Sequence, residues 1–251
     1  MKIRLLRHAA MIVGIGGRRL LVDPMLSPAG ALPAVRNSPN QVPNPLVPLP
    51  ESPYSILRVD AVLLTHTHFD HFDEAAAGLL PKEMPVVCQP EDTAKLAEMG
   101  FSQVLAVGET LSWRGIDLTR TGGQHGTGEI GKKMAPVSGY VLQAPEEPSL
   151  YIAGDTVWCP EVAQALDAHR PDLTVVYSGA ARFLTGDPIT MTAEDVGRVC
   201  RRAPGTKVVA VHLEAVNHCL LSRRELKDHL EKEGLTGQVL VPADGEELEF
   251  K

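Results

Sequence analysis

The segment Asp60–His71, with the sequence DAVLLTHTHFDH, joins an apolar run to a cluster of histidine and aspartate side chains. Its first half, Asp60–Thr65, has the short apolar pattern of a buried β-strand. Alternate residues of an extended chain point to the same side, so His66 and His68 can bind one metal ion together. The segment therefore predicts a metal site at the end of a buried strand.

Asp70 and His71 follow where the chain turns toward a helix predicted over Asp73–Leu80. The turn lets both side chains face a second ion close to the first. Several ionisable groups in such a short stretch are costly to bury unless they are paired or coordinated. A solvated polar turn is the plain alternative, but it does not explain the ligand-type residues at other strand ends.

Three such residues occur later in the chain. His125 lies in a glycine-rich turn, whereas Asp155 and His212 each follow an apolar run typical of a strand. A lone histidine in a glycine turn ordinarily has no function, and Asp155 could instead cap the helix that follows it. Their shared position at strand ends, where side chains of a sheet converge, favours one common site.

Strands and helices alternate along the whole chain, which is typical of an α/β protein. Besides the elements above, strands are predicted over Lys2–Leu6, Ala10–Ile15, Arg18–Val22, Val86–Val87, Val104–Val107, Ile116–Thr119, Gly139–Leu142, Leu150–Ala153, Leu173–Tyr177 and Lys207–Val211, and helices over Glu91–Met99, Pro160–His169, Ala193–Arg202 and Ser222–Glu233. The proline-rich stretch 24–53 can form neither a helix nor a central strand. We interpret it as an ordered loop over a pocket rather than a linker, within a single domain spanning residues 1–251.

Composition limits the possible functions. The chain has 251 residues, of which 44% are hydrophobic, and its formal net charge is -7. This acidic balance argues against non-specific nucleic-acid binding, which requires Lys and Arg to neutralise phosphates. The four cysteines form no CxxC pair, and no stretch approaches the roughly 20 apolar residues that span a bilayer. We expect reduced thiols, a cytoplasmic location, no membrane contact, and a small-molecule substrate; a homo-oligomer is compatible with the sequence.

The pattern HxHxDH, followed by a glycine-flanked His, a Gly-Asp-Thr and a His after a strand, resembles the metallo-β-lactamase superfamily. The resemblance covers essentially the whole chain, including Val22-Asp23-Pro24 after the first hairpin. Arg7-His8-Ala9, Ala153–Thr156 and Ile189–Thr192 are similar to the branch that includes the L-ascorbate 6-phosphate lactonases. The resemblance implies a four-layer αββα sandwich with metals at one edge.

The resemblance also implies a ligand set. One metal ion would be held by His66, His68 and His125, a second by Asp70, His71 and His212, and Asp155 would bridge both. The flavodiiron electron-transfer relatives carry Glu where His68 stands, so this chain resembles the hydrolases instead.

Imidazole and carboxylate ligands without thiolate suit two Zn²⁺ ions, with Mn²⁺ or Fe²⁺ as alternatives. Such a pair can ionise a bound water near pH 7 and hold the leaving group. We therefore expect a dinuclear hydrolase that uses metal-bound hydroxide on a small, anionic ester, lactone or phosphoester. A phosphodiesterase or nuclease on the same scaffold, or a metal-binding regulatory protein without catalysis, is the alternative.

Two residues are candidates for proton handling. Asp70 can contact both a metal ion and the water, and His218 lies on a loop shortly after the last ligand. Possible substrate contacts are Arg36 and Asn37 in the proline-rich loop and Arg182 in a later loop. His8, Glu214 and Asn217 could orient the metal-bound imidazoles.

Overall fold

The computed structural model describes residues 1–251 and contains two seven-stranded sheets. The first has the order β14-β1-β2-β3-β4-β5-β6, and its strands are β1 Lys2–Arg7, β2 Ala10–Ile15, β3 Arg18–Val22, β4 Ala61–Leu63, β5 Val86–Cys88, β6 Val104–Ala106 and β14 Glu247–Glu249. The second has the order β13-β12-β11-β10-β9-β8-β7, and its strands are β7 Thr110–Trp113, β8 Ile116–Thr121, β9 Gly139–Gln143, β10 Leu150–Ile152, β11 Leu173–Tyr177, β12 Lys207–Val211 and β13 Val239–Leu240.

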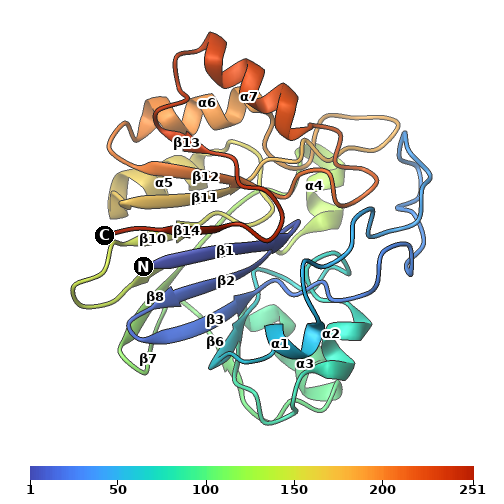
Figure 1. Cartoon of the computed structure of the whole chain (residues 1–251), viewed down its shortest axis with the longest axis vertical. Coiled ribbons are helices and arrows are strands. Elements are labelled where there is room, and N and C mark those ends of the chain that lie inside the picture. The colour runs from blue at the N-terminus through green and yellow to red at the C-terminus, as the bar shows by residue number, and fades with distance from the viewer.

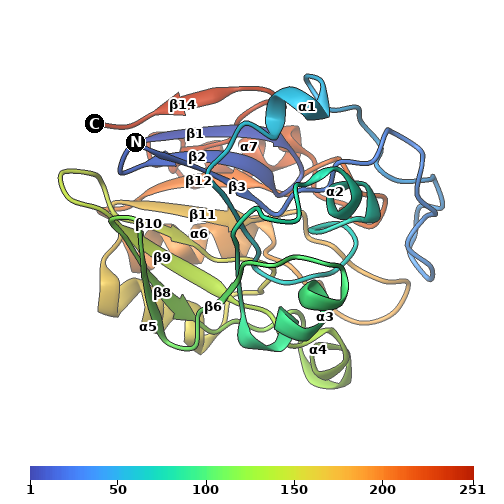
Figure 2. The ribbon, with the colours of Figure 1, turned by 90° about the horizontal axis from the view of Figure 1, so that it is seen from below.

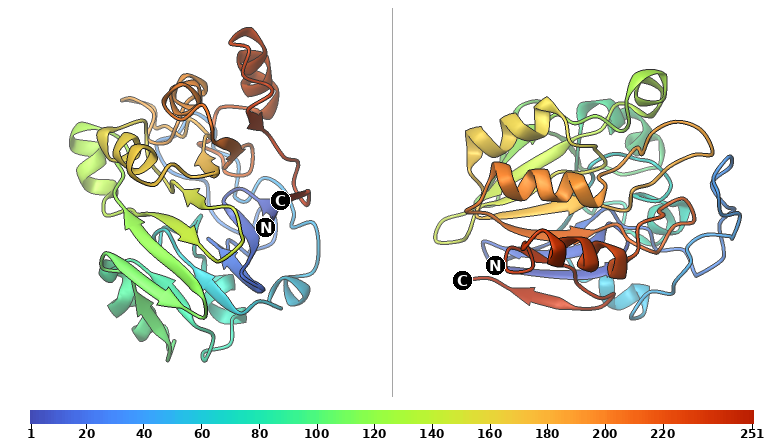
Figure 3. Two further views of the ribbon diagram at one scale, coloured as in Figure 1. Left: turned by 90° about the vertical axis from the view of Figure 1, so that its left-hand side faces the viewer. Right: turned by 90° about the horizontal axis from the view of Figure 1, so that it is seen from above.

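Helices cover the outer faces of the two sheets (Figures 1 and 3). They are α1 Pro53–Ile56, α2 Glu74–Leu79, α3 Thr93–Glu98, α4 Gly128–Met134, α5 Pro160–His169, α6 Ala193–Arg202 and α7 Arg223–Lys232, with a 3₁₀ turn over Pro90–Asp92. Figure 2 shows α2 and α3 on the side of the first sheet, whereas α5, α6 and α7 belong to the second. The αββα sandwich predicted from the sequence is confirmed.

The largest core lies between the sheets, where 23 buried residues pack. Strand β12 illustrates how one strand serves two layers: Val209 and Val211 join this inner core, while Val208 and Ala210 pack against the outer helices. A strand buried on both faces is apolar without interruption, which explains the run KVVAV. Leu226 and Leu230 of α7 complete the outer core of the second sheet.

Strand direction brings the functional loops together. In the first sheet, strands β3 to β6 are parallel to one another, and β1 runs in the same direction. In the second sheet, strands β10 to β13 are parallel to one another, and β8 runs in the same direction. The carboxyl ends of these strands therefore share one edge, from which the loop 24–53 extends (Figure 1, right). No helix is long and apolar enough to cross a membrane.

Several predicted elements needed correction. The helix expected over Glu91–Met99 is a 3₁₀ turn followed by the shorter helix α3, because Pro90 opens a tight turn before the helix begins. Helix α4, with the sequence GEIGKKM, was missed because its two glycines and exposed lysines give no helical apolar pattern. The short strands β7, β13 and β14 were missed as well. Helices α5 and α6 have the predicted bounds.

Candidate metal centre

Asp155 is the centre of the site. It follows β10 after Gly154, whose φ of +71° and close approach to the Ser138 carbonyl leave no room for a side chain. Its Oδ2 lies 3.2 Å from Nε2 of His71 and 3.2 Å from Nε2 of His125, and its Oδ1 lies 3.2 Å from Nε2 of His212. Residues from three separate strand ends therefore meet at one buried carboxylate.

Two groups of donor atoms flank this carboxylate. In the first, His66, His68 and His125 have donor atoms within 4.8 Å of one another, and His66 Nε2 lies 2.9 Å from His68 Nδ1. In the second group, the donor atoms of Asp70, His71, His212 and His8 also lie within 4.8 Å of one another. All seven ligands implied by the resemblance thus converge, although they come from four distant segments of the chain.

The outward-facing nitrogens of the imidazoles have their own partners. His125 Nδ1 donates to the Ile189 carbonyl at 2.8 Å, and His71 Nδ1 donates to Asp23 Oδ2 at 3.0 Å. His66 Nδ1 lies 3.0 Å from Thr65 Oγ1, which donates its own proton to Asp23. A protonated Nδ1 leaves a lone pair on Nε2, so the Nε2 atoms are oriented as ligands toward the carboxylates.

This donor set fits divalent cations. Asp155 Oδ1 is buried and accepts no hydrogen bond, so a cation would supply the charge that it faces. Burial lowers the pKa of His66 and of His212, which keeps these imidazoles neutral and able to coordinate. Burial also opposes protonation of His71, but the nearby carboxylates outweigh it and raise the pKa of this group. A metal ion would replace that proton.

Asp23 was flagged in the sequence only as part of a motif, and the structure places it beneath the metal ligands. Its carboxylate accepts from the Thr65 amide at 2.8 Å, the Thr65 hydroxyl at 2.7 Å, the Tyr177 hydroxyl at 2.8 Å and His71 Nδ1. Metal-bound histidines commonly donate to such an outer carboxylate, which orients the ring. Asp23 therefore orients His71 directly and His66 through Thr65.

Of the two proton-handling candidates, Asp70 lies within the cluster. Asp70 Oδ2 lies 3.9 Å from Nε2 of both His71 and His212, and its side chain is buried. His218 is also buried, and its Nδ1 has no hydrogen-bond partner. Its ring centroid lies 6.3 Å from that of Phe183.

Of the three residues expected to contact the substrate, only Asn37 lines the larger cavity near His125. Asn37 lines a cavity of about 840 Å³ together with Thr127, Ile130, Phe183 and Leu184, and Thr127 follows His125 by two residues. A smaller cavity of about 270 Å³ borders His125 itself and shares Thr127 and Gly128 with the first. Arg36 is exposed and does not line the larger cavity. Arg182 lines a different cavity, and its guanidinium donates to the Gly186 carbonyl at 3.3 Å.

Two expected orienting residues have other roles. Glu214 binds Arg223 through both carboxylate oxygens, at 2.7 Å to the guanidinium and 3.0 Å to the amide. Asn217 binds the proline-rich loop: its Oδ1 accepts from the Val35 amide and from Asn44, and its Nδ2 donates to Ser38. Their proposed contact with metal-bound imidazoles is wrong, because each side chain is already used by a closer partner.

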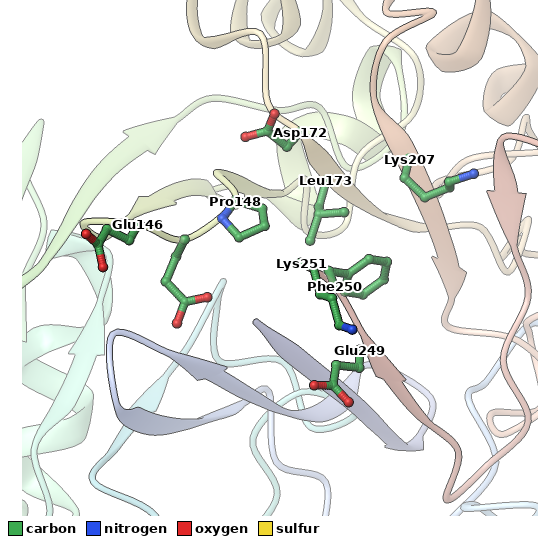
Figure 4. A pocket seen from close by; sticks show the side chains of 9 residues that line it. Glu146, Pro148, Asp172, Leu173, Lys207, Glu249, Phe250 and Lys251 are labelled. Atoms are coloured by element: carbon green, nitrogen blue, oxygen red, sulfur yellow. The ribbon is translucent and has the colours of Figure 1, made fainter.

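A cavity at the other end of the molecule is not part of this centre. It has a volume of about 770 Å³ and is lined by Asp172, Lys207 and Phe250, which lie at the beginning of β11 and β12 and near the carboxyl terminus (Figure 4). The metal ligands lie at the opposite ends of those strands. This cavity holds acidic and basic groups but no histidine.

Comparison with known proteins agrees with the geometry. A family model described as the β-lactamase superfamily domain matches residues 18–213, a range that contains every metal-ligand candidate from His66 to His212. The UPF0173 protein YddR from Bacillus subtilis is 39% identical over the full length of both chains. A UPF0173 metal-dependent hydrolase from Pyrobaculum aerophilum is 33% identical over 81% of this chain and 83% of its own.

Two solved structures are similar throughout. An isothiocyanate hydrolase from Delia radicum gut bacteria superimposes with a TM-score of 0.96 at 36% identity and covers 100% of this chain and 99% of its own. A possible metal-dependent hydrolase from Veillonella parvula gives the same TM-score at 34% identity, with 99% and 98% covered. The chain therefore belongs to the β-lactamase superfamily and is a metal-dependent hydrolase.

Proposed function

We propose that this enzyme holds two divalent metal ions and adds water to a small electrophilic substrate. His66, His68 and His125 would bind one ion, Asp70, His71 and His212 the other, and Asp155 both. The observation that carries the proposal is the position of Asp155, whose two oxygens lie 3.2 Å from imidazoles of both groups. Zn²⁺ is the first candidate because the donors are nitrogen and oxygen, and Mn²⁺ or Fe²⁺ suit the same donors.

The bound ions would supply a water whose pKa is near 7 and an electrophile for the substrate. The protein's own residues would then move the protons. Asp70 directs Oδ2 into the centre, where it can accept a proton from the attacking water. Burial lowers the pKa of His218, so this imidazole is neutral near pH 7 and can accept a hydrogen bond or a proton.

The larger cavity supports a small substrate with an apolar group. Ile130, Phe183 and Leu184 contribute its apolar wall, and the Leu184 side chain is 67% exposed. Ligand pockets are typically lined by apolar side chains together with a few polar groups. The charged lining residues are Glu129, Asp187 and Lys133, so the cavity has no excess of positive charge.

An isothiocyanate is the first substrate class that we propose, because the solved relative at 36% identity is named an isothiocyanate hydrolase. Water would add to the central carbon, forming a C–O bond and transferring a proton to nitrogen. Transfer of the second proton of the water to nitrogen and cleavage of the C–N bond would then release an amine and carbonyl sulfide. No oxidant or reductant is consumed.

An anionic ester, lactone or phosphoester is the second candidate. It is favoured by the two divalent ions themselves, since Asp70 and Asp155 neutralise only part of their charge. Lys133 is the one basic residue among the charged residues that line the cavity. Nucleic acid is disfavoured by the net charge of -7.

The test is a turnover assay of the metal-loaded enzyme on alkyl and aryl isothiocyanates, lactones and phosphodiesters. We expect isothiocyanate hydrolysis that His68→Ala reduces by at least about 100-fold, in line with the effect of removing a group that acts in the transition state. His169→Gln, on the distant helix α5, is the matched control and should retain wild-type rates. The proposal would be refuted if the metal-loaded wild-type enzyme hydrolysed none of these compounds faster than the His68→Ala variant does.

A further inference from the structure

His8 lies among the metal ligands although the resemblance gives it no place there. Its side chain is fully buried at the end of β1, and its Nε2 lies 3.3 Å from Asp70 Oδ2. The donor atoms of His8, Asp70, His71 and His212 all lie within 4.8 Å of one another. We propose that His8 is a further protein ligand of the metal ion held by Asp70, His71 and His212.

Distances support a ligand more than a simple hydrogen bond. A hydrogen bond from a ring N–H to an oxygen is usually about 2.7–3.2 Å long, whereas His8 Nε2 and Asp70 Oδ2 are 3.3 Å apart. Neighbouring donors in this site show the same wider spacing: His212 Nε2 lies 3.3 Å from His71 Nε2 and 3.2 Å from Asp155 Oδ1. Adjacent ligands of one ion, each about 2.1 Å from it, have such separations.

The oxygen that faces His8 is also the one that faces the other ligands. Asp70 Oδ2 lies 3.9 Å from Nε2 of His71 and 3.9 Å from Nε2 of His212. An ion bound to this oxygen would therefore lie between all three imidazoles. The other ring nitrogen of His8, Nδ1, is buried without a hydrogen-bond partner. Nε2, which faces Asp70, is therefore the nitrogen that would bind the ion.

The backbone holds His8 and His212 as a pair. Both residues have a left-handed conformation, with φ of 56° and 70°, which is uncommon outside glycine and often marks a functional site. The His212 amide donates to the His8 carbonyl at 2.9 Å, and the two ring centroids are 3.6 Å apart. The end of β1 in the first sheet and the end of β12 in the second thus present two imidazoles side by side.

This inference rests on the proposed metal centre but not on the identity of the substrate. The decisive experiment is a crystal structure of the wild-type protein loaded with Zn²⁺. We expect His8 Nε2 within about 2.1 Å of the ion that Asp70 binds. An ion bound by Asp70 and His212 with His8 Nε2 more than about 3 Å away would overturn the assignment of His8 alone, whereas no ion at any of the histidines would overturn the metal centre itself.

Solution measurements give an independent readout. In protein with ¹⁵N-labelled histidine, Zn²⁺ should shift the Nε2 resonance of His8, assigned by its loss in His8→Gln. An unshifted resonance in protein that carries two ions would overturn the proposal. Competition with a chelator measures the affinity for each of the two metal ions. We expect His8→Gln to lower the affinity for one ion by at least about tenfold and to leave the affinity for the other unchanged. His169→Gln should change neither affinity. Equal affinities in wild type and His8→Gln would also overturn it.

Discussion

The Tyr177 hydroxyl donates to Asp23 Oδ2 at 2.8 Å and connects the two sheets beneath the metal centre. Tyr177 ends β11 of the second sheet, and Asp23 follows β3 of the first. Both side chains are fully buried. Because the same carboxylate accepts from His71 and Thr65, the contact between the sheets and the orientation of the ligands depend on one residue.

We predict that Asp23→Asn weakens metal binding by about 10–100-fold, the usual effect of removing an outer-sphere partner. The amide cannot accept four hydrogen bonds, and it places an N–H against donors. Tyr177→Phe removes one of those bonds and should destabilise the fold by about 1–2 kcal/mol with a smaller effect on the metal. Chelator competition and urea unfolding measure the two effects. Wild-type metal affinity in Asp23→Asn would show that Asp23 does not orient the ligands.

Metal stoichiometry should separate the two groups of ligands. His68 belongs to the first group alone, so His68→Ala should reduce the metal content of the purified protein from about two ions to about one. Asp155 contacts imidazoles of both groups, and Asp155→Ala should lose most of both ions. Elemental analysis after gel filtration gives the counts. A full complement of metal in Asp155→Ala would contradict its bridging position.

The ligand candidates could be chosen from the sequence because their spacing is local and their position at strand ends is general. His66, His68 and Asp70 stand two positions apart along the chain. Asp155 and His212 each follow a clear apolar run. The partners of these ligands could not be derived in this way. Contacts such as Asp23 with Tyr177 join single residues that are 154 positions apart, and no periodicity records them.

Loop residues were the least predictable part of the site. Asn217 was close in sequence to His218 and was expected to face the metal, yet it faces the proline-rich loop. Arg182 was chosen for its charge, but its direction depends on a turn closed by the Gly186 carbonyl. Such directions follow from loop conformation, which is set by tertiary contacts rather than by residue type.

The contacts of Asn217 predict a role in holding the loop 24–53. Its backbone N–H donates to Asn44 Oδ1 at 2.8 Å, and its side-chain Oδ1 accepts from Asn44 Nδ2 at 2.8 Å, so the buried Asn44 side chain binds both the backbone and the side chain of Asn217. Asn217→Ala would keep the backbone bond to Asn44 Oδ1 but would leave Asn44 Nδ2 and the Val35 amide without their acceptor, at a cost of roughly 2–4 kcal/mol. We expect faster proteolysis within the loop as well as lower stability.

Asn40→Ala is the matched control for this variant. Asn40 lies on the same loop, and its side chain accepts only an exposed bond from the Val42 amide. Its replacement should change the stability by less than about 0.5 kcal/mol. If Asn40→Ala and Asn217→Ala were equally stable and equally resistant to protease, the loop would be held by other contacts.

The four cysteines should be inert in the folded protein. All are buried as free thiols, and burial raises the pKa of Cys88 to about 12 and that of Cys200 to about 11. Burial likewise raises the pKa of Cys159 and Cys219. Since the thiolate is the reactive form, iodoacetamide at about pH 8 should modify none of them until denaturant is added. Rapid native modification of any cysteine, detected by mass spectrometry, would contradict this prediction.

Acid should destabilise the metal-free protein through its buried histidines. Burial lowers the pKa of His68 to about 4 and also lowers the pKa of His66 and His212. The unfolded chain then binds more protons than the folded one below about pH 6.5, so stability is complete above that pH and is lost as the pH falls toward the folded values. Burial lowers the pKa of His8 and His218 in the same way. His71, whose pKa is raised, acts in the opposite direction, but it is one group against five.

We expect urea unfolding of the metal-free protein to show a clear loss of stability between about pH 7.5 and pH 5. His68 alone should contribute about 1–2 kcal/mol of that loss between about pH 6.5 and pH 5, after allowance for its partial exposure. His68→Gln, which cannot take up a proton, should therefore show a shallower dependence on pH. A stability that stays constant or rises on acidification would mean that these imidazoles are already protonated in the folded, metal-free protein, because only neutral histidines impose this penalty.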